Sequence, residues 1–335
     1  MGTSVSAAIR VEGLAKEFKG GTRAVDGITL EVEQGSIFGF LGPNGAGKTT
    51  TINILCTLLK PTEGRAFVAG YDCMKEPASV RKSIGLVFQD TTLDKDLTAY
   101  ENLVFHAYLY SVKKSEIRER VEDALGFVGL YERRDEVVKN YSGGMKRRLE
   151  VARGLIHRPQ VLFLDEPTLG LDPQSRAGLW DFITRLPERH GVTVFMTTHY
   201  MDEAEVCDRI AIIDAGRIIA QGSPSELKKT VGGDIIRLVT TDNELATWKL
   251  KESFSLDAIE QDGRLNITTP GGDKLIPDMI RSLEDVVVSV SLERPSINDV
   301  FLKLTGKAIR DAGASRRDDI PAGLRSARRR KDSRR

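Results

Sequence analysis

A glycine-rich segment at residues 42–49 has the spacing of a phosphate-binding loop. It reads GPNGAGKT and is followed by a second threonine. Glycines allow successive backbone N–H groups to turn inward around phosphate oxygens, and a helix that starts directly afterwards adds its positive end. In this pattern Lys48 brings a positive charge to the outer phosphates, and the Thr49 hydroxyl can bind Mg²⁺. The pattern predicts a nucleotide site made of Gly42, Pro43, Asn44, Gly45, Ala46, Gly47, Lys48, Thr49 and Thr50.

Two carboxylates follow an apolar run in VLFLDE, residues 161–166. At the end of a buried strand, Asp165 could hold Mg²⁺ through water, and Glu166 could polarise the water that attacks a phosphate. Taken alone, an acidic pair in this position is also typical of an ordinary strand end. The glycine-rich segment elsewhere in the chain favours the catalytic interpretation.

A second candidate anion site lies in YSGGMKRRLEVARGL, residues 141–155. Ser142, Gly143 and Gly144 precede a basic helix, and the start of a helix attracts anions. A plain Gly-Gly helix cap would have the same sequence. Because one phosphate loop needs only one such cradle, the second indicates that each nucleotide is held from two sides.

The elements that must position these groups alternate between strand and helix. Residues 36–41 (SIFGFL) predict a short buried strand, and residues 48–59 have helical periodicity that stops before Pro61. A β-rich opening precedes them, and roughly residues 98–140 have a helical, charged pattern. Further central strands are expected in IGLVF, VLFL, TVFMTTH and RIAIID. This alternation is typical of an α/β sheet with ligand loops at the ends of its strands.

The pattern starts again after QGSPSELKK. Residues 233–306 predict the order β-α-β-β-α-β, that of a small α+β ferredoxin-like module, and then a last helix, SINDVFLKLTG. Residues 310–335 are rich in Arg, Asp and Ala and predict a disordered basic tail. The tail holds ten Lys or Arg and four Asp, a net charge of +6 against −5 for the rest of the chain. It could contact anionic lipid or be a solvated end.

The composition restricts the class of protein. A mildly acidic body does not suit a nucleic-acid partner. The longest apolar runs, such as residues 286–292, are too short to span a bilayer, and the first residues lack the apolar core of a signal peptide. Cys56, Cys73 and Cys207 have no paired spacing, which fits a reducing compartment. We therefore expect a soluble protein inside the cell.

Six motifs in sequence order resemble those of the ABC ATPases over about residues 7–225. They are the Walker A loop at residues 42–50, the Q-loop at Gln89, the signature at residues 141–145, the Walker B strand at residues 161–166, the D-loop at residues 170–172 and the switch histidine His199. The resemblance implies a P-loop NTPase domain at residues 7–228 with a helical subdomain at about 98–158. It implies that this domain uses ATP and Mg²⁺.

The same resemblance assigns roles to residues. Gln89 would sense Mg²⁺ and the attacking water and link to a permease, His199 would contact the γ-phosphate, and Asp172 would join two protomers. Phe18 matches the aromatic residue on which adenine stacks, although a lone Phe is usually a core residue. Two residues depart from the family pattern: Met145 replaces the usual signature glutamine, and Leu169 stands where a small or polar residue is usual.

Within the family, residues 141–155, the single ATPase domain and the ending PSINDVFLKLTG resemble the daunorubicin-resistance group of exporter ATPases. This implies a head-to-tail homodimer on the cytoplasmic face of the membrane, paired with a separate permease that exports a drug, lipid or polyketide-like substrate. An importer ATPase with a ligand-sensing C-terminal domain is the alternative. A translation factor would carry two ATPase domains, and a chromosome ATPase would carry a long coiled coil; the sequence has neither.

Overall fold

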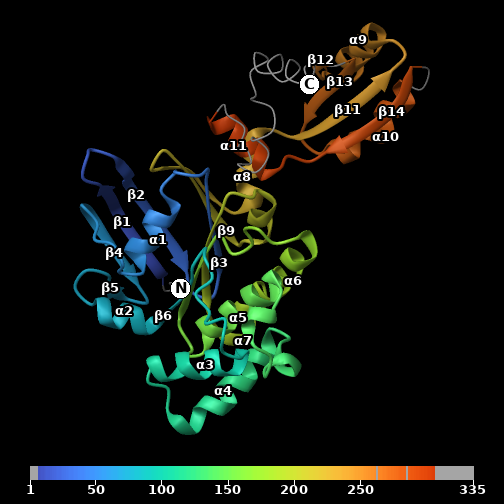
Figure 1. Ribbon diagram of the computed structural model, residues 1–335. Coiled ribbons are helices and arrows are strands. Elements are labelled where there is room, and N and C mark those ends of the chain that lie inside the picture. The colour runs from blue at the N-terminus through green and yellow to red at the C-terminus, as the bar shows by residue number, and fades with distance from the viewer. Residues whose placement is uncertain (1–6, 262, 284–285, 306–335) are drawn as a thin grey trace, which may run out of the picture.

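The computed structural model describes residues 7–261, 263–283 and 286–305 (Figure 1). The predicted basic tail at residues 310–335 lies outside these ranges, so its disorder and its lipid contact stay predictions. Among the described helices, none is long and apolar enough to cross a membrane. The N-terminal part of the chain forms a larger body, and most of the C-terminal part forms a smaller unit with its own sheet (Figure 1).

The larger body is built on a six-stranded sheet of order β10-β9-β3-β8-β7-β6. Strands β6, β7, β8, β3 and β9 run parallel, and β10 joins β9 antiparallel at one edge. Every residue of β3, β7 and β8 is buried, as expected for a parallel sheet covered on both faces. The predicted central strands are confirmed, with bounds β3 Ile37–Leu41, β6 Ile84–Val87, β7 Val161–Asp165, β8 Thr193–Thr198 and β9 Arg209–Asp214. The edge strand β10 Arg217–Gly222 was not predicted.

A second, antiparallel sheet of order β2-β1-β4-β5 lies beside α1 and the central sheet (Figure 1). Its strands are β1 Ala7–Glu17, β2 Arg23–Glu33, β4 Glu63–Val68 and β5 Tyr71–Asp72. Ile9, Val11 and Phe40 belong to one apolar cluster that joins the two sheets. Strands near the start of the chain were predicted, but this separate sheet was not.

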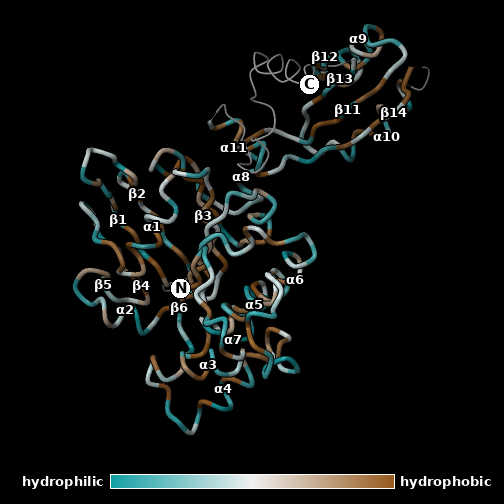
Figure 2. Tube along the Cα trace, viewed as in Figure 1, coloured by the Kyte–Doolittle hydropathy of each residue, from teal (hydrophilic) through white to brown (hydrophobic). Residues whose placement is uncertain are grey.

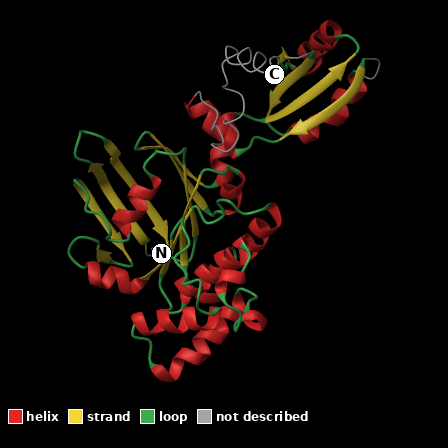
Figure 3. Cartoon of the chain, in the orientation of Figure 1, coloured by secondary structure: helices red, strands yellow, loops and turns green. Residues whose placement is uncertain are grey.

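The helices around the central sheet begin with α1 Lys48–Leu55. It is shorter than the predicted helix, because Cys56 ends it and Thr57 adopts a positive φ of 63°. Three helices, α3 Ala99–Leu109, α4 Lys114–Phe127 and α5 Gly143–Leu155, gather below the sheet in Figure 3. Further helical elements of the body are α2 Pro77–Ser83, η1 Tyr131–Arg133, η2 Val138–Asn140, α6 Pro173–Ile183, α7 Leu186–His190 and η3 Asp202–Val206.

The smaller unit is a four-stranded antiparallel sheet of order β12-β13-β11-β14 with two helices. Ile236, Leu238 and Ile267 from the sheet pack with Leu250 and Met279 from the helices in a separate core. Buried residues alternate with less buried ones along β13, and Figure 2 shows a largely hydrophobic stretch along β11. Its elements are β11 Asp234–Thr240, α9 Asn243–Phe254, β12 Ala258–Gln261, β13 Arg264–Thr269, α10 Gly272–Ser282 and β14 Val287–Glu293.

Two helices join the smaller unit to the larger body: α8 Pro224–Val231 precedes the smaller unit in the chain, and α11 Ile297–Thr305 follows it. Ile297, Val300 and Phe301 of α11 are buried in the core cluster of the larger body. Lys303 Nζ also donates to the carbonyl oxygens of Thr230 and Val231, at 2.7 and 3.1 Å. The C-terminal domain was predicted to extend to residue 306; its last helix, α11, packs against the larger body.

Candidate active site

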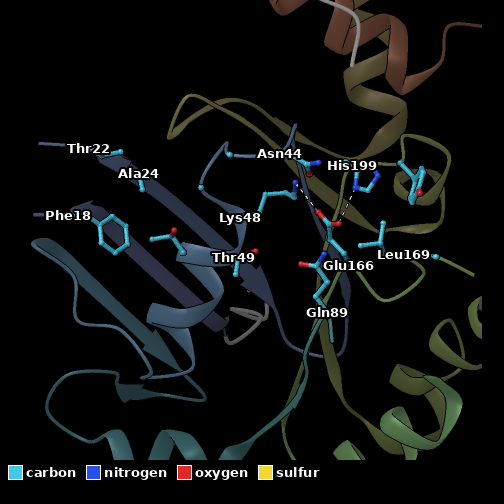
Figure 4. Close-up of a pocket in the computed structure, with 15 residues that line it drawn as sticks. Phe18, Thr22, Ala24, Asn44, Lys48, Thr49, Gln89, Glu166, Leu169 and His199 are labelled. Carbon is cyan, nitrogen blue, oxygen red and sulfur yellow. Dashed lines mark ion pairs between the residues drawn. The ribbon is translucent and has the colours of Figure 1, made fainter. Parts of the chain in front are cut away.

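A cavity of about 1030 Å³ opens where the start of α1 meets the ends of β7 and β8 (Figure 4). Ten of the predicted site residues line it: Phe18, Asn44, Gly45, Gly47, Lys48, Thr49, Thr50, Gln89, Glu166 and His199. It is also lined by residues to which the sequence analysis gave no binding role: Thr22, Ala24, Leu169, Gly170 and Tyr200. Loops at the ends of the parallel strands form most of this concave site, as such sheets usually do, and the β1–β2 region of the antiparallel sheet adds Phe18, Thr22 and Ala24.

The glycine-rich segment passes closer to its neighbours than a side chain would allow. A Cβ on Gly47 would lie 2.3 Å from the carbonyl oxygen of Ala24, and Gly47 has a φ of 107°. A Cβ on Gly42 would lie 2.3 Å from the carbonyl oxygen of Ile213. Side chains are therefore excluded at both positions, and the backbone forms a narrow cradle that suits phosphate oxygens.

Lys48 is the first residue of α1 and is almost completely buried. Its Nζ donates to the carbonyl oxygen of Gly42 at 2.7 Å and lies 3.2 Å from Glu166 Oε1. Burial lowers the pKa of Lys48, and the Glu166 carboxylate opposes that shift. The ammonium is thus held at the mouth of the cradle, where phosphate charge would meet it.

Glu166 lies between Lys48 and His199 (Figure 4). His199 Nδ1 is 3.2 Å from Glu166 Oε2, so one carboxylate contacts both side chains. Glu166 has a φ of 45°, an uncommon conformation for a residue with a side chain. Its N–H donates to Thr197 Oγ1 at 3.0 Å, which helps to hold that conformation.

The residues predicted to hold Mg²⁺ partly converge. Thr49 Oγ1 lies 3.5 Å from Asp165 Oδ1, and Thr197 Oγ1 donates to the same carboxylate oxygen at 2.5 Å. A hydroxyl and a carboxylate at this separation fit the oxygen ligands that Mg²⁺ prefers. Gln89, exposed at the cavity wall, completes the predicted set. Thr197 was not predicted as a site residue. The available signal was its position at the end of an apolar strand, two residues before His199.

The signature residues and Asp172 do not line this cavity. Ser142 caps α5 by accepting from the N–H of Met145 at 3.2 Å, and Asp172 caps α6 by accepting from the N–H of Ser175 at 2.9 Å. The two helix starts are close together, since a Cβ on Gly144 would lie 2.6 Å from Ser175 Oγ. Ser142, Gly143 and Asp172 are exposed. They form a second surface, separate from the cavity.

The two residues that depart from the family pattern have different surroundings. Met145 is 7% exposed and packs in the core of the larger body, with Arg133 Nη1 3.2 Å from its sulfur. Its side chain therefore does not belong to the exposed surface of the signature. Leu169, in contrast, is 39% exposed and lines the cavity.

Glu203 is a buried carboxyl that the sequence analysis missed. The hydroxyls of Thr198 and Thr168 donate to its two oxygens, the former at 2.6 Å. Thr198 directly precedes His199, and Thr168 lies two residues after Glu166. Burial raises the pKa of Glu203, and the two hydroxyls oppose that shift. Glu203 thus connects the segment that carries Glu166 to the one that carries His199.

Comparison with known proteins agrees with this geometry. Residues 25–169 match the family model described as ABC transporter. Residues 222–305 match the model described as ATP-binding protein DrrA1-3-like, C-terminal domain. The first match includes Lys48, Gln89, Glu166 and the signature helix α5, and the second includes the whole C-terminal unit, whereas Phe18 and His199 lie outside both.

Three individual proteins are informative. The daunorubicin/doxorubicin resistance ATP-binding protein DrrA of Streptomyces peucetius is 42% identical, over 91% of this chain and 94% of that protein. The linearmycin resistance ATP-binding protein LnrL of Bacillus subtilis is 36% identical, over 90% of this chain and 100% of that protein. A dimeric structure of the ATP-binding cassette MJ0796 with ADP and Pi has a TM-score of 0.58 and 27% identity, and covers 64% of this chain and 98% of that one.

Proposed function

This chain belongs to the ATP-binding proteins of ABC transporters, whose ATP hydrolysis is coupled to transport, and we propose that its cavity is one half of a shared ATP site. The observation that carries the proposal is the convergence of Lys48, Glu166 and His199 at one cavity. The other half would be the signature surface, Ser142 to Gly144, of a second copy. In a head-to-tail dimer each nucleotide would then lie between the two chains.

Two features support the shared site. Ser142 and Gly143 are exposed and, like Gly144, lie outside the cavity of their own chain, so within one chain nothing brings them to the nucleotide. The similar cassette MJ0796 is described as dimeric with ADP and Pi. Asp172, beside the signature, would lie at the same interface. The second surface thus gains a function only when a partner is present.

The residues of the site have distinct roles in the proposed mechanism. Lys48 and the backbone N–H groups of the cradle bind and orient the β- and γ-phosphates, and Phe18 stacks on adenine. Glu166 accepts a proton from the attacking water, while His199 and Gln89 orient the γ-phosphate and that water. Thr49, Asp165 and Gln89 would hold Mg²⁺, which would supply positive charge against the phosphates. Positioning and charge neutralisation thus supply the catalysis.

The transported substrate is proposed from the relatives. Both named relatives are resistance proteins against drugs, daunorubicin or doxorubicin in one case and linearmycin in the other. We infer export of a drug, lipid or polyketide-like compound through a separate permease, with this chain bound to its cytoplasmic face. The strand order β12-β13-β11-β14, with every pair antiparallel, supports a ferredoxin-like C-terminal module. Co-purification of the permease distinguishes an exporter from an importer that senses a ligand through this module.

The shared site is tested with two heterodimers that carry the same two substitutions. Lys48→Ala removes the loop lysine, and Ser142→Arg blocks the signature. With one change on each chain, a head-to-tail dimer keeps one intact site. With both changes on one chain and a wild-type partner, it keeps none.

Doubly tagged heterodimers, purified with the permease, are compared for ATP binding and hydrolysis. We expect an undamaged site only in the first arrangement. An undamaged site in the second arrangement would show that each chain contains a complete site, and would overturn the proposal.

A further inference from the structure

A buried arginine, Arg147, joins three functional segments of the larger body. It lies on α5, five residues after Ser142, and is 7% exposed. Its Nε donates to the carbonyl oxygen of Pro167 at 2.6 Å, and its Nη2 donates to those of Asp165 and Glu166 at 3.2 and 3.0 Å. The guanidinium therefore holds the backbone on both sides of Glu166.

The same guanidinium reaches the segment that carries Gln89. Arg147 Nη1 donates to the carbonyl oxygen of Phe88 at 2.5 Å and to Glu150 Oε2 at 2.9 Å. Glu150, also buried, accepts from the N–H of Thr92 at 2.9 Å through its other oxygen. Residues directly before and shortly after Gln89 are thus tied to α5.

All five N–H groups of a guanidinium have an acceptor in this arrangement. Four of the acceptors are backbone carbonyl oxygens, in the segments around Glu166 and before Gln89, and the fifth is the Glu150 carboxylate. A lysine has only three N–H donors and no planar fork, so it could keep the charge but not all of these contacts. A residue that only neutralised the charge of Glu150 would not need five donors directed at five acceptors.

We propose that Arg147, supported by Glu150, is a positioning residue for ATP hydrolysis. It fixes Glu166 relative to Gln89, and it ties both of them to the helix that starts at Ser142. In the head-to-tail dimer, the signature helix of one chain contacts the nucleotide of one site, and Glu166 and Gln89 of the same chain serve the other site. Arg147 would therefore transmit a movement of the signature helix at the first site to Glu166 and Gln89 at the second. This inference rests on the proposed function, because it requires Glu166 to act as the base.

Arg147→Lys in the full-length protein, assembled with its permease, tests the positioning role. We expect kcat for phosphate release to fall at least 10-fold, while KM for ATP changes less than 3-fold, because Arg147 does not line the cavity. Arg148→Lys is the matched control. Arg148 lies on the same helix but donates to the carbonyl oxygen of Val128, away from the Glu166 and Gln89 segments. The control should keep kcat within about 2-fold of wild type.

A heterodimer with one intact site tests where Arg147 acts. One chain carries Ser142→Arg and supplies the loop and base, and its partner carries Lys48→Ala and supplies the signature. Arg147→Lys should lower kcat at least 10-fold when added to the chain that supplies the base. Added to the other chain, it should lower kcat less than 3-fold. A general loss of folding would lower both equally, and thermal unfolding of each variant separates that outcome.

The outcomes distinguish the two proposals. If Arg147→Lys leaves kcat unchanged, or lowers it equally from either chain, Arg147 is not a positioning residue for its own Glu166. If the heterodimer without Arg147→Lys already fails to hydrolyse ATP, the shared site itself is wrong.

Discussion

At the scale of single residues, Glu166 is the proposed base of ATP hydrolysis. It lies within 3.2 Å of Lys48 Nζ and of His199 Nδ1. Glu166→Gln keeps the size of the side chain but removes the carboxylate that accepts a proton. We expect hydrolysis to fall about 10²- to 10⁴-fold while ATP still binds.

Phosphate release and nucleotide binding are measured on the same Glu166→Gln preparation, and size-exclusion chromatography with ATP follows the dimer. An ATP-stabilised dimer should accumulate, because the nucleotide is held but not hydrolysed. Hydrolysis at near the wild-type rate would mean that another group is the base.

The buried carboxyl of Glu203 leads us to expect that the stability of the fold depends on pH. Burial raises its pKa above the ordinary 4.5. Between pH 4.5 and the folded pKa, the folded state therefore keeps a proton that the unfolded chain has lost. The free energy of unfolding falls as pH rises through this window, by up to about 1.4 kcal/mol per pH unit. Well below pH 4.5 Glu203 is protonated in both the folded and the unfolded state, and its stabilising contribution to folding is fully present.

Glu203→Gln removes this titration. We expect the stability of the variant relative to wild type to increase as pH rises above 4.5 and to become constant above the folded pKa. Urea unfolding from pH 4 upward measures the difference. A difference between the two proteins that does not change with pH would contradict a raised pKa.

The sequence predicted the residues of the cavity better than those that support them. Lys48 and Thr49 follow from the glycine spacing, which is local in the chain. Glu203 and Arg147 act through contacts with segments 35 and 59 residues away in the sequence. A lone buried Glu or Arg has no local pattern, so only the tertiary structure identifies it.

At the scale of elements, the start of α5 is packed closely against α6. A Cβ on Gly144 would lie 2.6 Å from Ser175 Oγ and 2.8 Å from Ser175 Cβ. Gly144→Ala should therefore destabilise the protein by about 1–3 kcal/mol, as overpacking usually does. Gly143→Ala is the matched control, since its Cβ would meet only Leu171, at 3.7 Å.

Denaturant unfolding of the two glycine variants gives the comparison. Equal stabilities would mean that α6 moves away at little cost and that the two helix starts are not closely coupled. ATP binding to the separated monomer, measured in parallel, should persist in both, since neither glycine lines the cavity of its own chain.

The parallel strands of the central sheet were predictable because strands covered on both faces are short apolar runs. The sheet β2-β1-β4-β5 was not, because its long strands bend at irregular pairs and mix buried with exposed residues. The end of α1 was placed too late, since nothing in the sequence before Pro61 indicates that Thr57 adopts a positive φ.

At the scale of the whole molecule, α11 attaches the C-terminal part of the chain to the ATPase body. Phe301 is 2% exposed in the core of the larger body. Phe301→Ala should lower the stability of that body by about 3–5 kcal/mol. Trp248→Ala, at a position 58% exposed in the smaller unit, should change stability by less than about 0.5 kcal/mol.

Thermal unfolding with and without ATP identifies the relevant transition, because ligand binding shifts only the body that holds the site. If Phe301→Ala lowers a transition that ATP does not shift, α11 does not stabilise the ATPase body.

Because α11 packs on the larger body, both ends of the smaller unit are connected to that body. Ile235, near the start of β11, pairs directly with Glu293, the last residue of β14. The unit therefore enters and leaves at neighbouring positions, and in the chain it is an insertion between α8 and α11. A short Gly-Ser loop in place of residues 234–293 should leave ATP binding intact, and the corresponding segment of a relative should fit the same position. The unit is thus suited to exchange between transporters without redesign of the ATPase.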